Sequence, residues 1–149
     1  GLRPVLDHAE SQGVTLGFEP EPGMFIDTFE RFGGLLARIS HPRLRLTIDV
    51  GHVHCLEDGP IGPYIRQWGE LLVNVHIEDM VRGVHDHLMF GEGTIEFAEV
   101  FEALRAIRYE GGLNPTTRLF LASTRKISSS RRVMAHGLLS SPSRRPACP

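Results

Sequence analysis

Three side chains that can bind a divalent cation follow directly on short apolar stretches of the sequence. Glu19 comes after residues 14–18, Asp49 after 44–48 and His76 after 71–75. Mixed carboxylate and imidazole ligands suit Zn²⁺, Mn²⁺, Co²⁺ or Fe²⁺ better than Mg²⁺ or Ca²⁺, which prefer oxygen alone. Each residue taken singly also has a structural interpretation, as a loop charge (Glu19), a cap of the following turn (Asp49) or a hydrogen-bonded strand end (His76).

Histidine is concentrated in the middle of the chain, where five of the eight lie between positions 52 and 87. His52 stands three residues after Asp49, a spacing at which both side chains can reach one pocket. His85 and His87 flank a single residue, and alternate side chains of an extended segment point to the same side. Both imidazoles can therefore reach one ion. Taken together, these residues predict a divalent-metal site.

The elements that must position these residues alternate between short apolar strands and amphipathic helices. We predict strands at 14–18, 44–48 and 71–75, with a fourth beginning at Leu113. The predicted helices cover residues 2–12, 28–39, 62–70 and 97–107, with Asp27 or Thr28 as the cap of the second. A long loop is expected over residues 80–93.

This alternation predicts an α/β fold with a parallel sheet, either doubly wound or part of a (β/α) barrel. The polar residues favour the barrel, because the carboxyl ends of its strands converge on the face that carries active sites. The chain has 149 residues, which is short for a complete (β/α)₈ barrel of roughly 250. We therefore predict a partial barrel over residues 1–113. A half barrel has open sheet edges, so we expect a homo-oligomer or a completing partner.

Composition is ordinary for a soluble globular protein, with 41% hydrophobic and 23% charged residues. No apolar run approaches the ~20 residues of a membrane span. The first residues lack the pattern of a signal peptide, and two cysteines make no disulfide framework, so a cytoplasmic location is expected. The absence of an initial Met suggests a fragment or a processed form.

Charge divides the chain into two unlike parts. Residues 114–149 contain seven Lys/Arg and no acid, so residues 1–113 hold nine Lys/Arg against all 18 acids. The acidic body opposes a nucleic-acid partner. The Ser-, Arg- and Pro-rich segment 114–149 has three interpretations: a disordered tail, a basic arm for nucleic acid, or out-of-frame translation. We favour the third, because the change of composition falls inside a structural element.

Four segments resemble the successive motifs of the sugar phosphate isomerase/epimerase superfamily, also called xylose isomerase-like, to which endonuclease IV belongs. They are Leu16-Gly17-Phe18-Glu19-Pro20, Thr47-Ile48-Asp49-Val50-Gly51-His52, Asn74-Val75-His76-Ile77-Glu78-Asp79 and His87-Leu88-Met89-Phe90-Gly91-Glu92-Gly93. The resemblance implies a TIM barrel with one to three divalent metals. It covers roughly strands 5–7 and the start of strand 8.

The same resemblance implies a role for each of the three strand-end residues. Glu19 matches the metal-binding glutamate of strand 5, which in ketose epimerases is also a catalytic acid/base. Asp49 matches the metal-binding aspartate of strand 6, and His76 matches the metal-binding histidine of strand 7.

For the other histidines the resemblance leaves two roles open. His52 matches a histidine that binds substrate in epimerases or a second metal in endonuclease IV. His85 and His87 lie where endonuclease IV has an Asp-x-His metal pair, and here the first member is histidine. We therefore expect these three residues to contact a second metal or the substrate.

The largest departure from the family pattern is at strand 8. The pattern requires a glutamate there, as fourth metal ligand and second acid/base, but no acid follows Leu113. The implied function is a metal-dependent isomerase or epimerase of a sugar, sugar phosphate or keto-acid, acting by proton transfer through an enediolate and impaired in this chain. The alternatives are an endonuclease IV-like phosphodiesterase and a non-catalytic remnant of a barrel enzyme.

Overall fold

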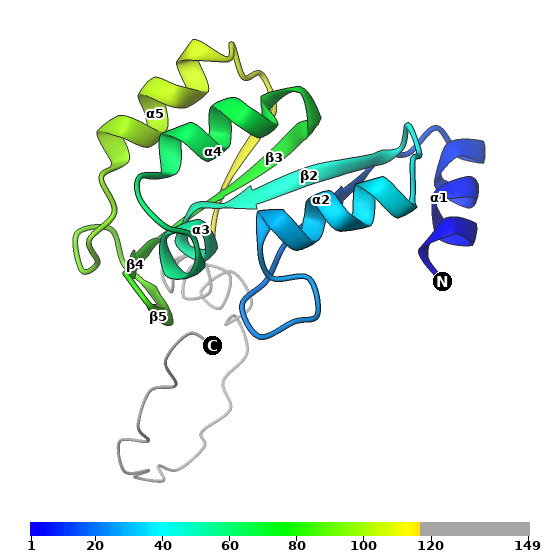
Figure 1. Ribbon diagram of the computed structural model, residues 1–149. Coiled ribbons are helices and arrows are strands. Elements are labelled where there is room, and N and C mark those ends of the chain that lie inside the picture. Colours follow the sequence, from blue (N-terminus) through cyan, green and yellow to red (C-terminus); the bar gives the residue numbers. More distant parts are fainter. Residues whose placement is uncertain (117–149) are drawn as a thin grey trace, which may run out of the picture.

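The computed structural model describes residues 1–116, and Figure 1 shows helices and strands alternating along them. One sheet has the order β1-β2-β3-β6, and each neighbouring pair is parallel. Successive strands of this sheet therefore pair in chain order without the reversal that marks a doubly wound fold, which confirms the partial barrel. The strands are β1 (Leu16–Phe18), β2 (Leu44–Asp49), β3 (Leu72–Ile77) and β6 (Gly112–Pro115).

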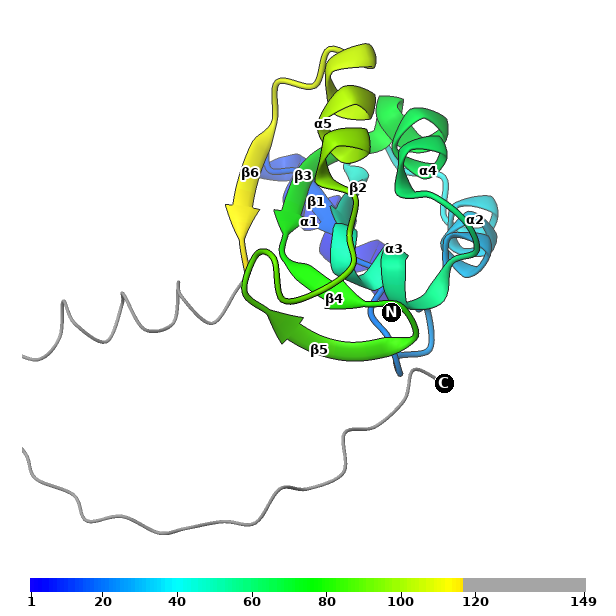
Figure 2. The ribbon, with the colours of Figure 1, turned by 90° about the vertical axis from the view of Figure 1, so that its left-hand side faces the viewer.

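Helices cover one face of this sheet, as Figure 2 shows with α5, α4 and α2 on the same side of the strands. They are α2 (Phe29–Arg38), α4 (Ile61–Trp68) and α5 (Phe97–Ala106), while α1 (Leu2–Ser11) precedes β1. The core lies between the two layers, where strand side chains such as Leu46 and Val75 pack with helix side chains such as Phe32, Ile65 and Val100, all fully buried. Burial of these apolar stripes fixes the sheet against its helices.

The predicted helix boundaries agree with the structure where a clear stop or cap is present. Thr28 caps α2, because its Oγ1 accepts a hydrogen bond from the backbone N–H of Arg31 at 3.3 Å. After α1 the backbone turns at Gly13, whose φ of +67° favours glycine. The helix expected at 62–70 is α4 followed by a 3₁₀ turn, Gly69–Leu71.

A short helix, α3 (Val50–Leu56), begins immediately after β2 and was not predicted. Seven residues are too few for a convincing amphipathic period, and so the sequence pattern gave no signal. Tertiary contacts stabilise the helix instead, because all of its residues from 50 to 55 are buried. Its amino end is capped by Asp49, the structural role considered for that residue.

The loop expected over residues 80–93 contains an antiparallel hairpin, so that prediction was wrong for its first half. The hairpin consists of β4 (Asp79–Val81) and β5 (Val84–Leu88), joined through Gly83 at a φ of +74°. It lies across the carboxyl ends of the parallel strands (Figure 1). Its strands have only three and five residues, and half of these are Asp or His, so there is no apolar run from which a strand is usually predicted.

The sheet continues two residues past the expected boundary at 113. Pro115 lies in β6 opposite Ile77, although proline is disfavoured in a central strand because it lacks a backbone N–H. Backbone N–H groups alternate along a strand, and it is Thr116 that donates to the Ile77 carbonyl, at 3.2 Å. Pro115 can therefore lack a donor without loss to the pairing with β3.

The interpretations of the basic segment from residue 117 onward lie outside the described residues. Within residues 1–116, every helix is too short or too polar to cross a membrane.

Candidate metal centre

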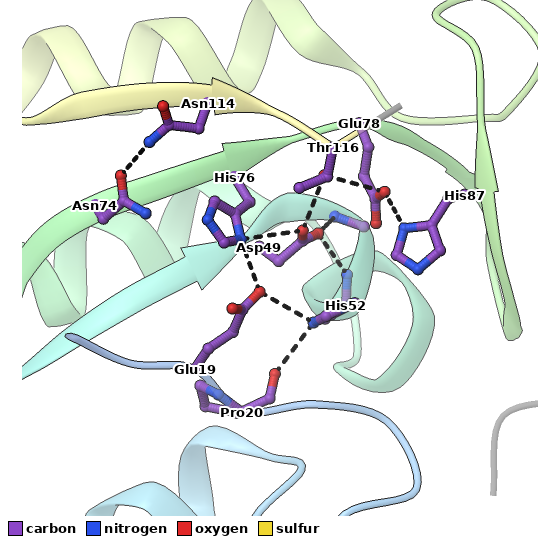
Figure 3. Close-up of polar contacts among 11 residues, drawn as sticks. Glu19, Pro20, Asp49, His52, Asn74, His76, Glu78, His87, Asn114 and Thr116 are labelled. Carbon is purple, nitrogen blue, oxygen red and sulfur yellow. Dashed lines mark hydrogen bonds and ion pairs between the residues drawn. The ribbon is translucent and has the colours of Figure 1, made fainter. Parts of the chain in front are cut away.

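The three strand-end residues predicted as metal ligands lie together at the carboxyl edge of the sheet (Figure 3). Asp49 and His76 are partners in the register of β2 and β3, and Glu19 follows β1 directly. His76 Nδ1 lies 2.9 Å from Glu19 Oε1 and 3.9 Å from Asp49 Oδ2. We call Glu19, Asp49 and His76 the rim cluster.

The two carboxylate oxygens of Asp49 have different partners: one caps a helix and the other faces the site. Its Oδ1 accepts hydrogen bonds from the backbone N–H groups of Gly51 at 2.7 Å and His52 at 3.2 Å, which caps α3. Its Oδ2 faces His76 and the hydroxyl of Thr116, which donates to it at 3.3 Å. The capping and ligand interpretations of this residue are therefore compatible, because they use different oxygens.

The predicted histidines form a second group, the histidine cluster, which consists of His52 on α3 and His85 and His87 on β5. Ring centroids lie 5.1 Å apart for His52 and His85, 5.2 Å for His85 and His87, and 6.0 Å for His52 and His87. The alternation along β5 places both of its histidines on the same side, as the spacing predicted, and there they meet His52 of α3. The Nε2 atoms of His52 and His85 are buried without a hydrogen-bond partner among the described residues.

His52 joins the two clusters. Its Nδ1 lies 3.3 Å from the Pro20 carbonyl oxygen and 3.7 Å from Glu19 Oε1. One ligand atom from each of Glu19, Asp49 and His52 can lie within 4.8 Å of the others, and the same holds for the histidine cluster. The donors of Glu19, Asp49 and His52, and separately those of the three histidines, thus fit a divalent cation in type and spacing, while His76 is placed at the rim by its contacts with Glu19 and Asp49.

Glu78 is a site residue that the sequence analysis did not single out. It follows β3, is fully buried, and accepts from the Thr116 hydroxyl at 3.1 Å through Oε2. The same oxygen contacts His87 Nδ1. A signal was present, because Glu78 stands two residues after His76 and so shares its side of an extended segment. The sequence analysis includes Glu78 in a family motif but predicts no role for it.

The carboxyl groups of Asp49 and Glu19 are buried close to other carboxylates, and this raises their pKa values. Burial, with a smaller effect of Glu78, holds the pKa of Asp49 well above its usual value. Burial also raises the pKa of Glu19, partly offset by His76. A bound cation would relieve both effects, because it stabilises the ionised carboxylates.

The pKa values of His52 and His87 are shifted in opposite directions. Burial lowers the pKa of His52 to about 4, so its imidazole is neutral near pH 7 and retains a lone pair for a cation. The hydrogen bond to Glu78 raises the pKa of His87. Protons therefore compete for His87 over a wider pH range than for His52.

Thr116 follows β6, close to where the resemblance to the family leads us to expect a glutamate. Its hydroxyl oxygen lies 3.3 Å from Asp49 Oδ2 and 3.1 Å from Glu78 Oε2. The single hydroxyl hydrogen can be donated fully to only one of these oxygens at a time, and a hydroxyl adds no negative charge or strong ligand. Within the described residues the rim cluster has no fourth ligand from this strand.

Asp79 explains the Gly-Glu-Gly motif that precedes α5. Its Oδ2 accepts from the backbone N–H groups of Gly91 at 2.8 Å and Gly93 at 3.0 Å, and its Oδ1 accepts from Ile95 at 3.3 Å. A Cβ at Gly93 would overlap the Asp79 carboxylate. This carboxylate therefore has a structural role, in fixing the loop after the hairpin.

Known proteins agree with the architecture. The xylose isomerase-like TIM barrel family matches residues 1–118. An uncharacterised protein of Methanocaldococcus jannaschii is 30% identical over 114 residues, which are 74% of this chain and 39% of that protein. L-ribulose-5-phosphate 3-epimerase UlaE of Salmonella paratyphi A is 27% identical over 111 residues, with the same two shares.

Solved structures give the same result. The apo crystal structure of the 3-keto-D-glucoside 4-epimerase YcjR from E. coli has a TM-score of 0.69 at 25% identity, over 78% of this chain and 43% of that one. A D-tagatose 3-epimerase-like protein has a TM-score of 0.70 at 25% identity, over 85% and 49%. The chain spans about two fifths of the length of the curated relatives that it matches. By sequence and by fold, it belongs to the xylose isomerase-like TIM barrel family.

Proposed function

We propose that this chain carries part of the active site of a divalent-metal-dependent isomerase or epimerase acting on a sugar, sugar phosphate or keto-acid. The observation that carries the proposal is the convergence of Glu19, Asp49 and His76 at the strand ends. His76 Nδ1 lies 2.9 Å from Glu19 Oε1 and 3.9 Å from Asp49 Oδ2. The relatives support a sugar as the substrate class, because the curated and structural matches include sugar epimerases.

The rim cluster would hold the cation, with His52 beside it. Two carboxylates and imidazole nitrogen favour Mn²⁺, Zn²⁺, Co²⁺ or Fe²⁺ over Mg²⁺. Such a cation polarises a carbonyl or hydroxyl oxygen as a Lewis acid. The histidine cluster would bind a second cation or the substrate.

Glu19 is the residue that we assign to proton transfer. Its side chain is a quarter exposed, so a substrate can reach it, whereas Asp49 is almost fully buried. Burial raises the pKa of Glu19, which makes its ionised form a stronger base. In the metal-free chain His76 Nδ1, 2.9 Å from Glu19 Oε1, orients the carboxylate. With a cation bound, this nitrogen would be a metal ligand and the cation would hold Glu19 in place.

A second acid/base group is missing on the opposite side of the proposed site. Thr116 follows β6, and its hydroxyl donates to the carboxylate of Asp49 or of Glu78. Glu78 is fully buried and has no access to a substrate. Glu19 alone can remove a proton and return it to the same face, but cannot return it to the opposite one. We therefore propose that net epimerisation, which requires a proton on the opposite face, is impaired in this chain.

The histidine cluster favours a second candidate, an endonuclease IV-like phosphodiesterase, because clustered metals can activate water against a phosphodiester. The excess of nine acids in residues 1–113 opposes the binding of a polyanion. A non-catalytic remnant is the third candidate. Hydrolysis of an abasic-site DNA duplex with added Zn²⁺ would favour the second candidate.

Proton exchange in D₂O tests the proposed reaction in the full chain. With Mn²⁺ or Co²⁺ and a panel of ketoses, keto-acids and their phosphates, we expect deuterium to enter at the carbon next to the carbonyl without appreciable epimerised product. Glu19→Gln should abolish the exchange, and Glu21→Gln, one residue beyond Pro20, should retain it. Rapid net epimerisation would refute the impairment, and no exchange with any substrate of the panel would refute the proposed function.

The open sheet edges of the half barrel affect the oligomeric state that we expect. Among the described residues β1 and β6 each have one neighbouring strand, β2 and β3 respectively. Open edges of this kind favour pairing with another chain. We propose a homo-oligomer, which sedimentation of the full chain would test.

A further inference from the structure

Glu78 is buried in a way that the proposed reaction does not explain. The residue is fully inaccessible, and its Oε1 has no hydrogen-bond partner among residues 1–116. Its Oε2 accepts from Thr116 and contacts His87 Nδ1. Burial of a partly satisfied carboxylate is unfavourable by itself. The contact with His87 is therefore the feature of this residue that calls for a role.

The packing around Glu78 leaves room for its carboxylate only because residue 51 is glycine. A Cβ at Gly51 would lie 2.5 Å from Glu78 Oε1 and 2.8 Å from the Met80 methyl group. Any side chain at this first turn of α3 would displace the carboxylate. The carboxylate thus lies in a confined space between α3 and the hairpin, from which it reaches His87.

The contact determines which nitrogen of His87 can bind a cation. A carboxylate oxygen accepts hydrogen bonds, so Nδ1 of His87 must carry the donated proton. In the neutral ring the lone pair is then on Nε2. His52 and His85 also have an Nε2 atom without a hydrogen-bond partner in the described part of the chain. Each histidine of the cluster thus has one nitrogen available, and one ring nitrogen of each lies within 4.8 Å of one ring nitrogen of the others, a spacing that a shared cation allows.

We infer that Glu78 is the positioning residue of the histidine cluster, fixing His87 as the Nδ1–H tautomer so that three imidazoles bind one late first-row cation such as Zn²⁺ or Co²⁺. The inference rests on the proposed function only in taking this cluster as a second metal position. Carboxylates that orient metal-binding histidines in this way raise the basicity of the ring and are worth about 10–100-fold in metal affinity. Neutral imidazoles suit Zn²⁺ and Co²⁺ better than Mg²⁺.

The first test is cation binding by the full chain. Zn²⁺ affinity is measured by competition with a chromophoric chelator, and Co²⁺ by its visible absorption. Glu78→Gln should weaken the site by about 10–100-fold and change the Co²⁺ spectrum. Glu21→Gln is the matched control, because the Glu21 carboxylate acts on His52 and His87 by charge alone. Binding by Glu78→Gln as tight as in the unaltered chain overturns the inference.

A second measurement needs no variant. Long-range ¹H–¹⁵N spectra of the metal-free chain should show His87 as the Nδ1–H tautomer. An Nε2–H tautomer overturns the inference, even if Glu78→Gln does not fold.

Two further variants separate this inference from the proposed function. Asp49→Asn should retain one bound Zn²⁺, and His85→Ala should lose that one while retaining the cation of the rim cluster. If Asp49→Asn abolishes all binding and His85→Ala changes nothing, the rim site stands and the inference falls. If the chain binds no Zn²⁺ at millimolar concentration, both fall.

Discussion

The rim cluster and the histidine cluster are built on different parts of the fold. The rim cluster lies at the ends of β1, β2 and β3, so the sheet register itself brings its members together. The histidine cluster draws two of its three members from the β4–β5 hairpin, outside that sheet. Its three donors all come from the described residues, whereas β6 supplies no carboxylate to the rim cluster. The parallel sheet thus carries the cluster that has no fourth ligand from β6, and the hairpin outside the sheet carries most of the cluster whose three donors are all present.

Removal of the Asp49 charge should give the largest difference between the clusters. In Asp49→Asn we expect Mn²⁺ or Zn²⁺ affinity of the rim cluster to fall at least 100-fold, about 3 kcal/mol. Without metal, the variant should be at least as stable as the parent, because its buried carboxyl has a raised pKa and disfavours ionisation. Thermal melting with metal and with chelator measures both. A large loss of stability in chelator would mean that Asp49 acts mainly through its charged cap of α3.

A change of pH should affect the two clusters with opposite sign in the metal-free chain. His52 titrates at about 4 when folded and near 6.5 when unfolded. The unfolded chain binds more protons between these values, so His52 destabilises the fold as the pH falls from 6.5 to 4, by about 2–3 kcal/mol. Asp49 and Glu19, with raised pKa values, instead destabilise it as the pH rises through their folded pKa values.

Urea unfolding of the parent and of His52→Gln, in chelator, isolates the histidine contribution. The stability difference between the two should change in favour of His52→Gln as the pH falls below 6.5. A difference that stays constant from pH 7 to pH 4 would contradict the low pKa of His52.

A carboxylate placed after β6 should give the rim cluster a fourth ligand and so reduce the difference in metal affinity between the two clusters. Thr116→Glu adds a charge beside Asp49 and Glu78, so we expect rim affinity for Mn²⁺ to rise about tenfold, or 1.4 kcal/mol, with a loss of metal-free stability. Zn²⁺ binding by the histidine cluster should be unchanged. Titrations with each cation test this, and Thr116→Gln, which adds length without charge, is the control.

The smallest expected effect is at a position remote from both clusters. Thr28→Ala removes the cap of α2 and should cost about 1 kcal/mol. The cost should be equal with and without metal, because α2 carries no proposed ligand. Thr28→Ser, which retains the hydroxyl, should restore the stability. A cost that depends on metal would show that the whole sheet, and not the strand ends alone, responds to the cation.

Prediction from sequence succeeded where a periodic pattern and a site residue coincide. Apolar strands that end in Glu19, Asp49 and His76 gave the parallel sheet and the geometry of the rim. The hairpin and α3 were missed because both are short and are stabilised by long-range contacts, such as His52 against His85. Glu78 was missed because its burial depends on Gly51 and His87, which are distant in sequence.

The Asp79 carboxylate helps to fix the base of the hairpin. It accepts from the backbone N–H groups of Gly91, Gly93 and Ile95, and the Thr94 N–H donates to the Met80 carbonyl, so the start of the hairpin is tied to the segment that leads into α5. Met80 and Leu88 are buried, so the base of the hairpin has to be kept. Protein engineers could treat residues 83–87, beyond this base, as a replaceable cassette, and vary the second metal position or the substrate pocket on an unchanged barrel.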